Sequence, residues 1–331
     1  MRVAVIGAGA VGGAIAAMLA RAGHDVEVTA RGANLDSIRS GGIRLSGAWG
    51  EHTARVLANE LLTRGAELVI VATKARDAGA AIADNATMLQ GVPVVVIQNG
   101  LEGMTAARLA SPRSDIAGGL ATFATSYLIP GEITVTTAGP TYLGVETGLS
   151  DLPARYAAKI LNRVMPTSVV ANFAGAQWTK LVINQVNALP AITGMSVQEV
   201  IADRGLRRVM TASMQENVRI GLASGIHFEK LQGLSHRGLR VFAAVPAWVA
   251  QLLPLLMSRR IGTTPNPGST LQSIRRGQPT EIDFLNGAVV TAAHAIGREA
   301  PVNAALVALV HEVESGGEFF TAAQVIARVQ P

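Results

Sequence analysis

The sequence predicts an α/β domain followed by an all-α domain, and three observations support this fold class. Short β-branched runs alternate with Ala-rich helical stretches over roughly the first 150 residues. Continuous apolar runs such as VAVI and LVIVA suit parallel strands that are buried on both faces. From about Gly175 onward the strand signal largely disappears. We therefore expect a doubly wound sheet over residues 1–170 and a helical domain over residues 171–331.

Each element of the first domain follows from its local pattern. Ala10–Ala22 is Ala-rich and is expected to form a helix that ends at Gly23. The segment Gly131–Val145 has the pattern of an antiparallel hairpin, which we place at the edge of the sheet. The strands are expected at Arg2–Ile6, Asp25–Thr29, Leu68–Ala72, Val92–Ile97 and Ile116–Phe123.

The second domain is expected to consist of helices rich in Ala, Leu and Val. The apolar residues of these stretches recur at helical spacing, and no strand-like runs of alternating β-branched residues lie between the stretches. The helices are expected at Ala176–Ala191, Ser196–Ala202, Leu206–Gly221, Pro246–Met257, Thr280–Gly297 and Asn303–Glu314.

Composition excludes several classes of protein. Apolar residues make up 49% and charged residues only 15%, which excludes a disordered chain. The absence of cysteine excludes disulfides and thiolate metal sites, so we expect no metal and a reducing, cytoplasmic location. The net charge of +5 includes no long run of Lys or Arg, so no nucleic acid partner is expected.

One uncharged stretch, Val241–Met257, needs separate consideration because it is 17 residues long. It contains two prolines and is short for a membrane span, so no membrane insertion is expected. A buried helix pair and an interface with a second copy are the two interpretations, and the latter makes a homodimer a candidate assembly.

A glycine motif follows the first predicted strand. Gly7, Gly9 and Gly12 form G-x-G-x-x-G between the strand VAVI and the helix that follows, as a Rossmann-type dinucleotide site requires. Gly7 allows a tight turn, Gly9 lets a pyrophosphate approach the backbone, and Gly12 lets the helix and strand pack closely. The anion is then stabilised at the helix N-terminus. The alternative is a plain strand-turn-helix without a ligand.

The end of the second strand indicates which dinucleotide is bound. NAD sites place an acid there to bond the ribose 2′-hydroxyl. Glu27 has the expected distance from Gly7 but lies inside the strand, whereas the strand ends at Thr29-Ala30-Arg31. Arg31 is well placed to bind a 2′-phosphate, because guanidinium offers paired donors and stays charged. This pattern favours NADP over NAD, the alternative being a solvated arginine.

Two polar residues follow later strands of the same sheet. Lys74 comes after LVIVAT and Asn99 comes after VVVI, at the carboxyl ends where such sheets bind ligands. We expect Lys74 to contact phosphate or ribose and Asn99 to reach the nicotinamide end. Spacing alone leaves open that each is an ordinary loop residue.

A polar stripe occurs in the second domain. Lys180, Asn184 and Asn187 are spaced i, i+4 and i+7 and therefore share one helix face. Asn is a poor helix former, so two aligned with a Lys suggest donors for a polar ligand, and a solvated helix face is the alternative. Further on, Thr280 has the pattern of an N-cap, with Asp283 three residues later and Glu281 in the first helical turn. Helix capping alone would also explain that pattern.

The residues named above are similar to those of the ketopantoate reductases (2-dehydropantoate 2-reductases). The resemblance covers nearly the whole chain. It is carried by GAGAVGG, Arg31, Lys74, QNG at 98–100, WTKLVINQVNALPAITG at 178–194 and the segment from Ser269 through TEIDFLNG at 280–287.

This resemblance implies an NADPH-dependent reduction of the 2-oxo acid ketopantoate to pantoate, on the route to pantothenate and coenzyme A. Lys180 matches the family's catalytic lysine, and Glu281 matches the glutamate that holds the substrate hydroxyl. Asn184, Asn187 and Ser269 match substrate-binding positions. Lys74 and Asn99 match positions of the cofactor pocket.

Two positions depart from the family pattern. Many members place the second asparagine four residues after the first, whereas position 188 here is Ala. We expect Asn187 to take its place through a local adjustment of the helix. Many members also carry an acid where this chain has Ser273. These departures leave two alternatives open: a related reductase of another 2-oxo acid, and a non-catalytic NADP-binding sensor.

Overall fold

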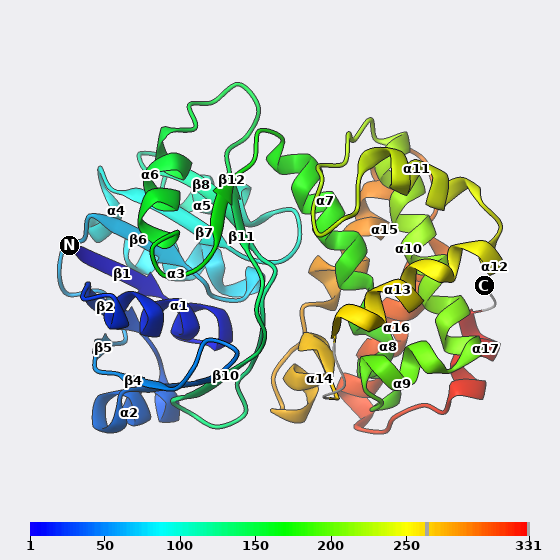
Figure 1. Cartoon of the computed structure of the whole chain (residues 1–331), viewed down its shortest axis with the longest axis horizontal. Coiled ribbons are helices and arrows are strands. Elements are labelled where there is room, and N and C mark those ends of the chain that lie inside the picture. The colour runs from blue at the N-terminus through cyan, green and yellow to red at the C-terminus, as the bar shows by residue number, and fades with distance from the viewer. Residues whose placement is uncertain (262–264, 330–331) are drawn as a thin grey trace. The chain divides into compact units, whose positions relative to one another are not determined.

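The computed structural model describes residues 1–261 and 265–329. The chain forms two compact units, Met1–Phe173 and Ala174–Pro331 (Figure 1). The first unit combines sheets and helices, and the second is helical. The predicted fold class, a Rossmann-type α/β domain followed by an all-α domain, is therefore confirmed.

The core of the first unit is an eight-stranded sheet of order β12-β11-β8-β7-β6-β1-β2-β5. Its strands are β1 (Arg2–Ile6), β2 (Asp25–Thr29), β5 (Leu57–Asn59), β6 (Leu68–Val71), β7 (Pro93–Ile97), β8 (Asp115–Ala121), β11 (Thr141–Gly144) and β12 (Thr167–Val169). All neighbours pair in parallel except β8 and β11. β1 lies between β2 and β6, with Val3 paired to Val26 on one side and to Leu68 on the other. β1 and β6 are almost completely buried, as their continuous apolar runs predict.

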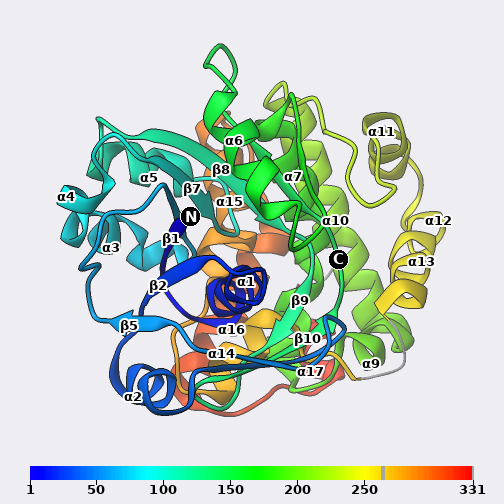
Figure 2. The same cartoon turned by 60° about the vertical axis from the view of Figure 1, so that its left-hand side comes forward.

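A second sheet of order β4-β3-β10-β9 covers part of the same unit. It contains β3 (Ile43–Gly47), β4 (His52–Ala54), β9 (Ala124–Ser126) and β10 (Glu132–Thr137). Helix α1 (Ala10–Arg21) packs between the two sheets, contacting β1 and β2 on one side and β3, β4, β9 and β10 on the other (Figure 2). Seven of its twelve residues are buried, because both sides of the helix are covered.

The predicted hairpin at Gly131–Val145 was wrong. Its two strands exist but do not pair with each other, since β10 belongs to the four-stranded sheet and β11 to the eight-stranded sheet. β10 pairs with β3 and β9, and β11 pairs with β8 and β12. The remaining helices of the unit are α2 (Gly32–Gly41), η1 (Ala75–Asp77), α3 (Ala78–Asp84), α4 (Ala86–Leu89), α5 (Gly103–Ala110) and α6 (Leu152–Leu161).

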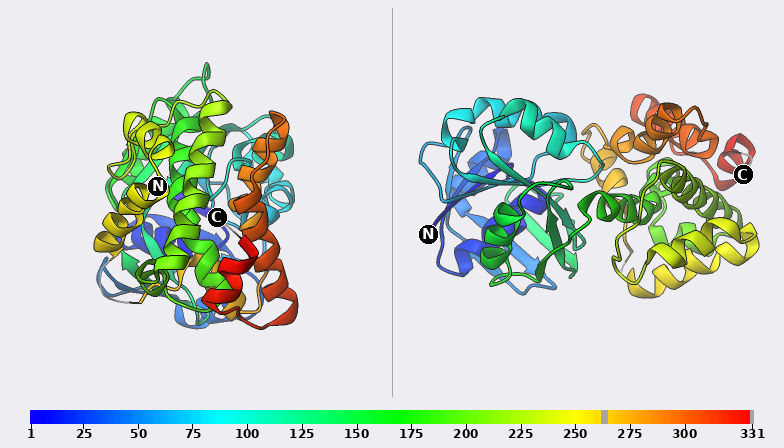
Figure 3. Two further views of the ribbon diagram at one scale, coloured as in Figure 1. Left: turned by 90° about the vertical axis from the view of Figure 1, so that its right-hand side faces the viewer. Right: turned by 90° about the horizontal axis from the view of Figure 1, so that it is seen from above.

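The second unit is built around the long helix α10 (Arg204–Ala223), which contacts most of the other helices of the unit (Figure 3). The others are α7 (Phe173–Asn184), η2 (Gln185–Asn187), α8 (Ala188–Thr193), α9 (Val197–Ala202), α11 (His236–Ala244), α12 (Ala247–Ala250), α13 (Leu252–Ile261), α14 (Gly268–Arg275), η3 (Ile282–Phe284), α15 (Asn286–Ala295), α16 (Pro301–Gly316) and α17 (Ala322–Val329).

Three predicted helices of this unit are interrupted. The expected helix Ala176–Ala191 changes to a 3-10 turn at Gln185–Asn187. Thr280–Gly297 is a 3-10 turn followed by α15, and Pro246–Met257 divides into α12 and α13. Within the described residues, no helix is both long and apolar enough to cross a membrane. Trp248 and Leu252 of the α12–α13 region are exposed, and homodimerisation through this surface stays a prediction.

Candidate active site

The glycine loop has the geometry of an anion cradle. Gly7 has a φ of +96°, and its amide donates to Thr29 Oγ1 at 2.9 Å. A Cβ on Gly12 would lie 2.1 Å from the Gly7 carbonyl oxygen, so no other residue fits there. A Cβ on Gly9 would meet nothing within 4 Å, and no side chain caps α1 at this position. The first amides of α1 are therefore approachable by a ligand, and the loop fits a dinucleotide pyrophosphate.

The loops that follow β6 and β7 are hydrogen-bonded to each other. Gln98, just after β7, donates from Nε2 to the Thr73 carbonyl oxygen at 2.9 Å, and so joins the loops that carry Lys74 and Asn99. Gln98 Oε1 is buried and has no hydrogen-bond partner among the described residues. A buried amide oxygen without a donor is costly. This orphaned acceptor fits a donor group of a bound cofactor, a role that sequence spacing did not assign to Gln98.

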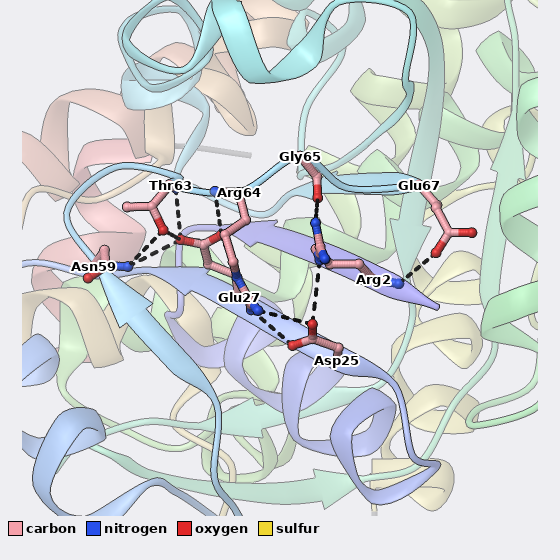
Figure 4. Close-up of polar contacts among 8 residues, drawn as sticks. All are labelled: Arg2, Asp25, Glu27, Asn59, Thr63, Arg64, Gly65 and Glu67. Carbon is pink, nitrogen blue, oxygen red and sulfur yellow. Dashed lines mark hydrogen bonds and ion pairs between the residues drawn. The ribbon is translucent and has the colours of Figure 1, made fainter.

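Glu27 serves the fold rather than a ribose. Its carboxylate is fully buried and accepts from Asn59 Nδ2, Thr63 N, Thr63 Oγ1 and Arg64 N at distances of 2.7–3.1 Å (Figure 4). Arg64 also pairs with Asp25 through both of its terminal nitrogens. Glu27 thus holds the loop after β5 against β2. Since its oxygens are already used, the acid at the usual distance from the glycine loop is not available for a 2′-hydroxyl.

Arg31 lies where β2 gives way to α2, and its side chain is 74% exposed. Its Nη2 is 3.6 Å from Asp84 Oδ2 at the end of α3. A surface ion pair of this kind contributes little to stability, so the guanidinium can exchange its partner for a ligand phosphate at small cost. Arg31 is therefore an exposed cation just after the carboxyl end of β2.

In the second unit, Asn184 and Asn187 are brought into line by the change from α7 to η2. Side chains three residues apart eclipse in a 3-10 helix, whereas in an α-helix they are offset by 60°. Asn187 Nδ2 donates to the Asn184 carbonyl oxygen at 3.0 Å, and both side chains are buried. The 3-10 turn is therefore a local change of helix geometry that aligns Asn187 with Asn184.

Lys180 precedes this turn by one helical turn of α7. Burial lowers the pKa of Lys180 from its ordinary value of 10.5 to about 8. Desolvation has this effect because it penalises the charged ammonium relative to the neutral amine. The neighbouring Thr179 donates its hydroxyl hydrogen bond to the backbone oxygens of Gly175 and Glu229, which fixes α7 against the loop after α10. Lys180 can therefore lose and regain a proton near neutral pH.

Ser269 joins the same group of residues through its backbone. Its amide donates to Asn187 Oδ1 at 3.1 Å, and its side chain is exposed at the first turn of α14. Gly268, with a φ of +70°, makes this approach possible, because a Cβ there would lie 2.7 Å from Asn187 Oδ1. Ser273 is buried and donates to the Ser269 carbonyl oxygen. The structure thus brings Asn184, Asn187 and Ser269 together.

Glu281 lies at the start of η3. The helix cap that the sequence predicted at Thr280, with Asp283 three residues later, was wrong. Thr280 Oγ1 accepts only a long bond from Ile282 N, and Asp283 does not reach back to cap it. The Thr280 amide donates instead to Glu314 Oε1 on α16. His311 Nε2 and Nδ1 contact Asp283 and Glu314, at 2.9 and 2.7 Å. α16 therefore holds the backbone before Glu281 at Thr280 and the side chain after it at Asp283.

The pKa of His311 reflects these contacts. Burial lowers the pKa, but the hydrogen bonds to Asp283 and Glu314 and the two negative charges outweigh burial and raise it above 6.5. His311 thus links α16 to the η3 region through Asp283, and sequence spacing did not reveal this link because the two elements are far apart in the chain.

A glycine-loop dinucleotide fold followed by a helical unit that carries a lysine of lowered pKa fits a nicotinamide-dependent oxidoreductase. Comparison with known proteins gives the family. The family model for "Ketopantoate reductase PanE/ApbA" matches residues 3–148, and the one for "Ketopantoate reductase PanE/ApbA C terminal" matches residues 172–314. The chain belongs to the ketopantoate reductase family and is an oxidoreductase.

Individual relatives agree with this assignment. A 2-dehydropantoate 2-reductase of Archaeoglobus fulgidus is 28% identical, covering 95% of this chain and 98% of the relative. One from Pyrococcus horikoshii is 26% identical, covering 96% and 99%. The crystal structure of a PanE/ApbA family ketopantoate reductase from Ralstonia eutropha JMP134 is 28% identical, with a TM-score of 0.79, covering 96% and 99%. A D-mandelate dehydrogenase solved with NADH and anilino(oxo)acetate, 18% identical over 96% and 99% of the chains, shares the fold with a TM-score of 0.81.

Proposed function

We propose that this protein reduces 2-dehydropantoate to pantoate with NADPH, in pantothenate and coenzyme A biosynthesis. The names of the curated relatives support the reaction. The observation that carries the chemical part is Lys180, a half-buried lysine whose pKa is lowered to about 8. It lies one helical turn before two aligned buried asparagines.

In the proposed reaction the bound cofactor supplies a hydride to the 2-oxo carbon of the substrate. The carbonyl oxygen then becomes an alkoxide and needs a proton. Lys180 donates that proton from Nζ, and before the transfer its positive charge stabilises the developing negative charge. A pKa of about 8 suits this task, because the amine is mostly protonated at neutral pH yet releases its proton readily.

The neighbouring residues would bind and orient the substrate. Asn184 and Asn187 would hold the carbonyl and carboxylate together with Ser269, whose exposed hydroxyl lies at the start of α14. Glu281 would accept a hydrogen bond from the substrate hydroxyl and stabilise the Lys180 cation. Holding the reactants in this way makes the reaction effectively unimolecular.

The first unit would hold the cofactor. The glycine loop of Gly7, Gly9 and Gly12 would bind the pyrophosphate at the N-terminus of α1, and Arg31 would bind the 2′-phosphate. Lys74 and Asn99, which follow β6 and β7, would contact the phosphates or ribose and the nicotinamide end. The choice of NADPH over NADH is supported by the exposed guanidinium of Arg31 and by the engagement of Glu27 within the fold.

A second candidate is the reduction of a different branched or aromatic 2-oxo acid by the same chemistry. The observations that favour it are the asparagine at 187 rather than 188, and the buried Ser273 where many family members carry an acid. Both differences lie near the residues that would bind the substrate, so they affect which 2-oxo acid fits more than how it is reduced.

A panel of 2-oxo acids tests these proposals. NADPH oxidation is followed at 340 nm with 2-dehydropantoate and with other branched and aromatic 2-oxo acids. The highest kcat/KM is expected with 2-dehydropantoate. A higher value with another acid supports the second candidate, and no turnover with any acid indicates a non-catalytic NADP-binding protein.

A further inference from the structure

A cluster of buried polar side chains lies inside the second unit, apart from the residues proposed to touch the substrate. We call it the amide cluster, and it consists of Gln185, Ser213, Glu216, Asn286 and Asn303. Gln185, Ser213, Asn286 and Asn303 are at most 1% exposed. Polar groups buried this deeply in an Ala- and Leu-rich core must satisfy one another.

The bonds of the amide cluster converge on two oxygens. Gln185 Oε1 accepts from Ser213 Oγ at 2.5 Å and from Asn286 Nδ2 at 2.7 Å. Asn303 Oδ1 accepts from Asn286 Nδ2 at 2.9 Å and lies 3.0 Å from Ser213 Oγ, whose single hydrogen is shared between Asn303 and Gln185. Glu216 completes the cluster by accepting from Asn303 Nδ2 at 2.6 Å. Asn286 Nδ2 and Ser213 Oγ are therefore the two donors that join Gln185 to the remainder of the cluster.

Two members of this cluster lie close in sequence to the proposed catalytic residues. Gln185 follows Lys180 by five residues and is the first residue of the 3-10 turn that aligns Asn184 with Asn187. Its Nε2 donates back to the Leu181 carbonyl oxygen of α7 at 3.3 Å. Asn286 follows Glu281 by five residues and is the first residue of α15. The bond between Gln185 and Asn286 spans 101 residues and joins these two segments directly.

We propose that Gln185 and Asn286 are positioning residues, which hold the segment bearing Lys180 and Asn184 in register with the segment bearing Glu281. This inference rests on the proposed function. Hydrogen bonds in a buried network are directional and strong, so the pair sets the relative placement of the two segments more tightly than apolar contacts would. A misplacement of about 1 Å at a reacting group costs about a hundredfold in rate.

The test compares Gln185→Met, Asn286→Ala and the double variant with the wild-type enzyme. We expect kcat to fall about tenfold to a hundredfold in each single variant. The KM for NADPH should stay within twofold, because its proposed site lies in the first unit. We also expect the alkaline limb of the pH profile to move, since the surroundings of Lys180 change. The double variant should lose less activity than the two single losses combined, because the bond between Gln185 and Asn286 is removed in both single variants.

Asn217→Ala is the matched control. Asn217 lies on α10 one turn after Ser213, is fully buried, and has no hydrogen-bond partner among the described residues. Its substitution perturbs the same core without breaking the amide cluster, so kcat and the pH profile should be unchanged. If Asn286→Ala does not fold, Ser213→Ala removes only one donor to Gln185 and is judged by the same criteria, with a smaller loss of kcat.

The outcomes separate this inference from the proposed function. Lower melting temperatures with unchanged kcat and pH profile show that the amide cluster is only structural and overturn the inference alone. Additive losses in the double variant also overturn it, because the two residues would then act independently. A wild-type enzyme that reduces none of the 2-oxo acids overturns the proposed function and this inference together.

Discussion

Asn187 Oδ1 accepts a hydrogen bond from the backbone amide of Ser269, 82 residues further along the chain. This bond fixes the start of α14 against the 3-10 turn that follows α7. The tighter winding of that turn also brings position 187 into line with Asn184. The turn and the start of α14 therefore hold each other in place.

Gly9→Ala is expected to separate cofactor binding from folding. A Cβ at this position meets nothing within 4 Å, and the φ of −82° is accessible to alanine. The melting temperature should therefore stay close to that of the wild type. The added methyl group occupies the approach to the first amides of α1, so the Kd for NADPH should rise at least about tenfold, a loss of about 1.4 kcal/mol. Fluorescence titration with NADPH and a thermal melt measure the two effects.

Gly12→Ala is the contrasting variant in the same loop. Its Cβ would lie 2.1 Å from the Gly7 carbonyl oxygen and 2.9 Å from Ala72 Cβ, so the strand and helix must move apart. Overpacking of this kind costs about 1–3 kcal/mol, and a fall of that size in the free energy of unfolding in urea is expected. Equal stability of the two variants would contradict the different packing that the structure assigns to the two glycines.

The sequence predicted the elements whose pattern is local. The buried parallel strands and the glycine loop were predicted because continuous apolar runs and glycine spacing are read within a few residues. The polar stripe of Lys180, Asn184 and Asn187 was also visible, but as one regular helix. The 3-10 turn within it depends on contacts such as the one to Ser269, which no local pattern contains.

Other features depended on partners distant in sequence. β10 and β11 have the pattern of a hairpin because they are adjacent in the sequence, yet they belong to different sheets. Thr280 has the pattern of a helix cap, but its amide is satisfied by Glu314 from α16. The amide cluster was not predicted, because Gln185 and Asn286 are 101 residues apart and neither has an unusual neighbourhood.

Glu27→Ala is expected to reduce stability without changing cofactor preference. The substitution leaves the part-buried amides of Thr63 and Arg64 and the Asn59 side chain without their acceptor. The loss should be about 3 kcal/mol in the free energy of unfolding, measured in urea. Glu60→Ala, at an exposed acid in the loop after β5, is the control and should have little effect. A selective change in NADH affinity in Glu27→Ala would contradict its assignment to the fold.

Arg31→Ala is expected to weaken NADPH binding about tenfold to a hundredfold, the loss of a charge-assisted hydrogen bond of about 1.5–3 kcal/mol. The Kd for NADH should be unchanged, because NADH has no 2′-phosphate for the guanidinium to bind. Isothermal titration with both nucleotides measures the difference, and Arg113→Ala, at an exposed arginine of the same unit, should leave both unchanged. Comparable kcat/KM of the wild-type enzyme with NADH and NADPH would show that Arg31 does not select the cofactor.

Lys180→Ala is expected to lower kcat at least about a hundredfold, which is a typical contribution of a general acid. Its Kd for NADPH should not change, because the proposed cofactor site lies in the first unit. Lys230→Ala is the matched control, since this lysine belongs to the same unit but is exposed. Near-normal turnover of the Lys180 variant would exclude it as the proton donor.

The pH dependence of kcat/KM tests the same role in the wild-type enzyme, where Lys180 is still present. The proton donor must carry its proton, and burial lowers the pKa of Lys180 to about 8. The protonated fraction therefore falls as pH rises through this value, so kcat/KM should be level near pH 7 and fall tenfold per pH unit well above 8. Lys180→Arg keeps a positive charge that is not titrated in this range. Its residual activity should lose the alkaline limb, whereas a limb that persists in this variant would belong to another group.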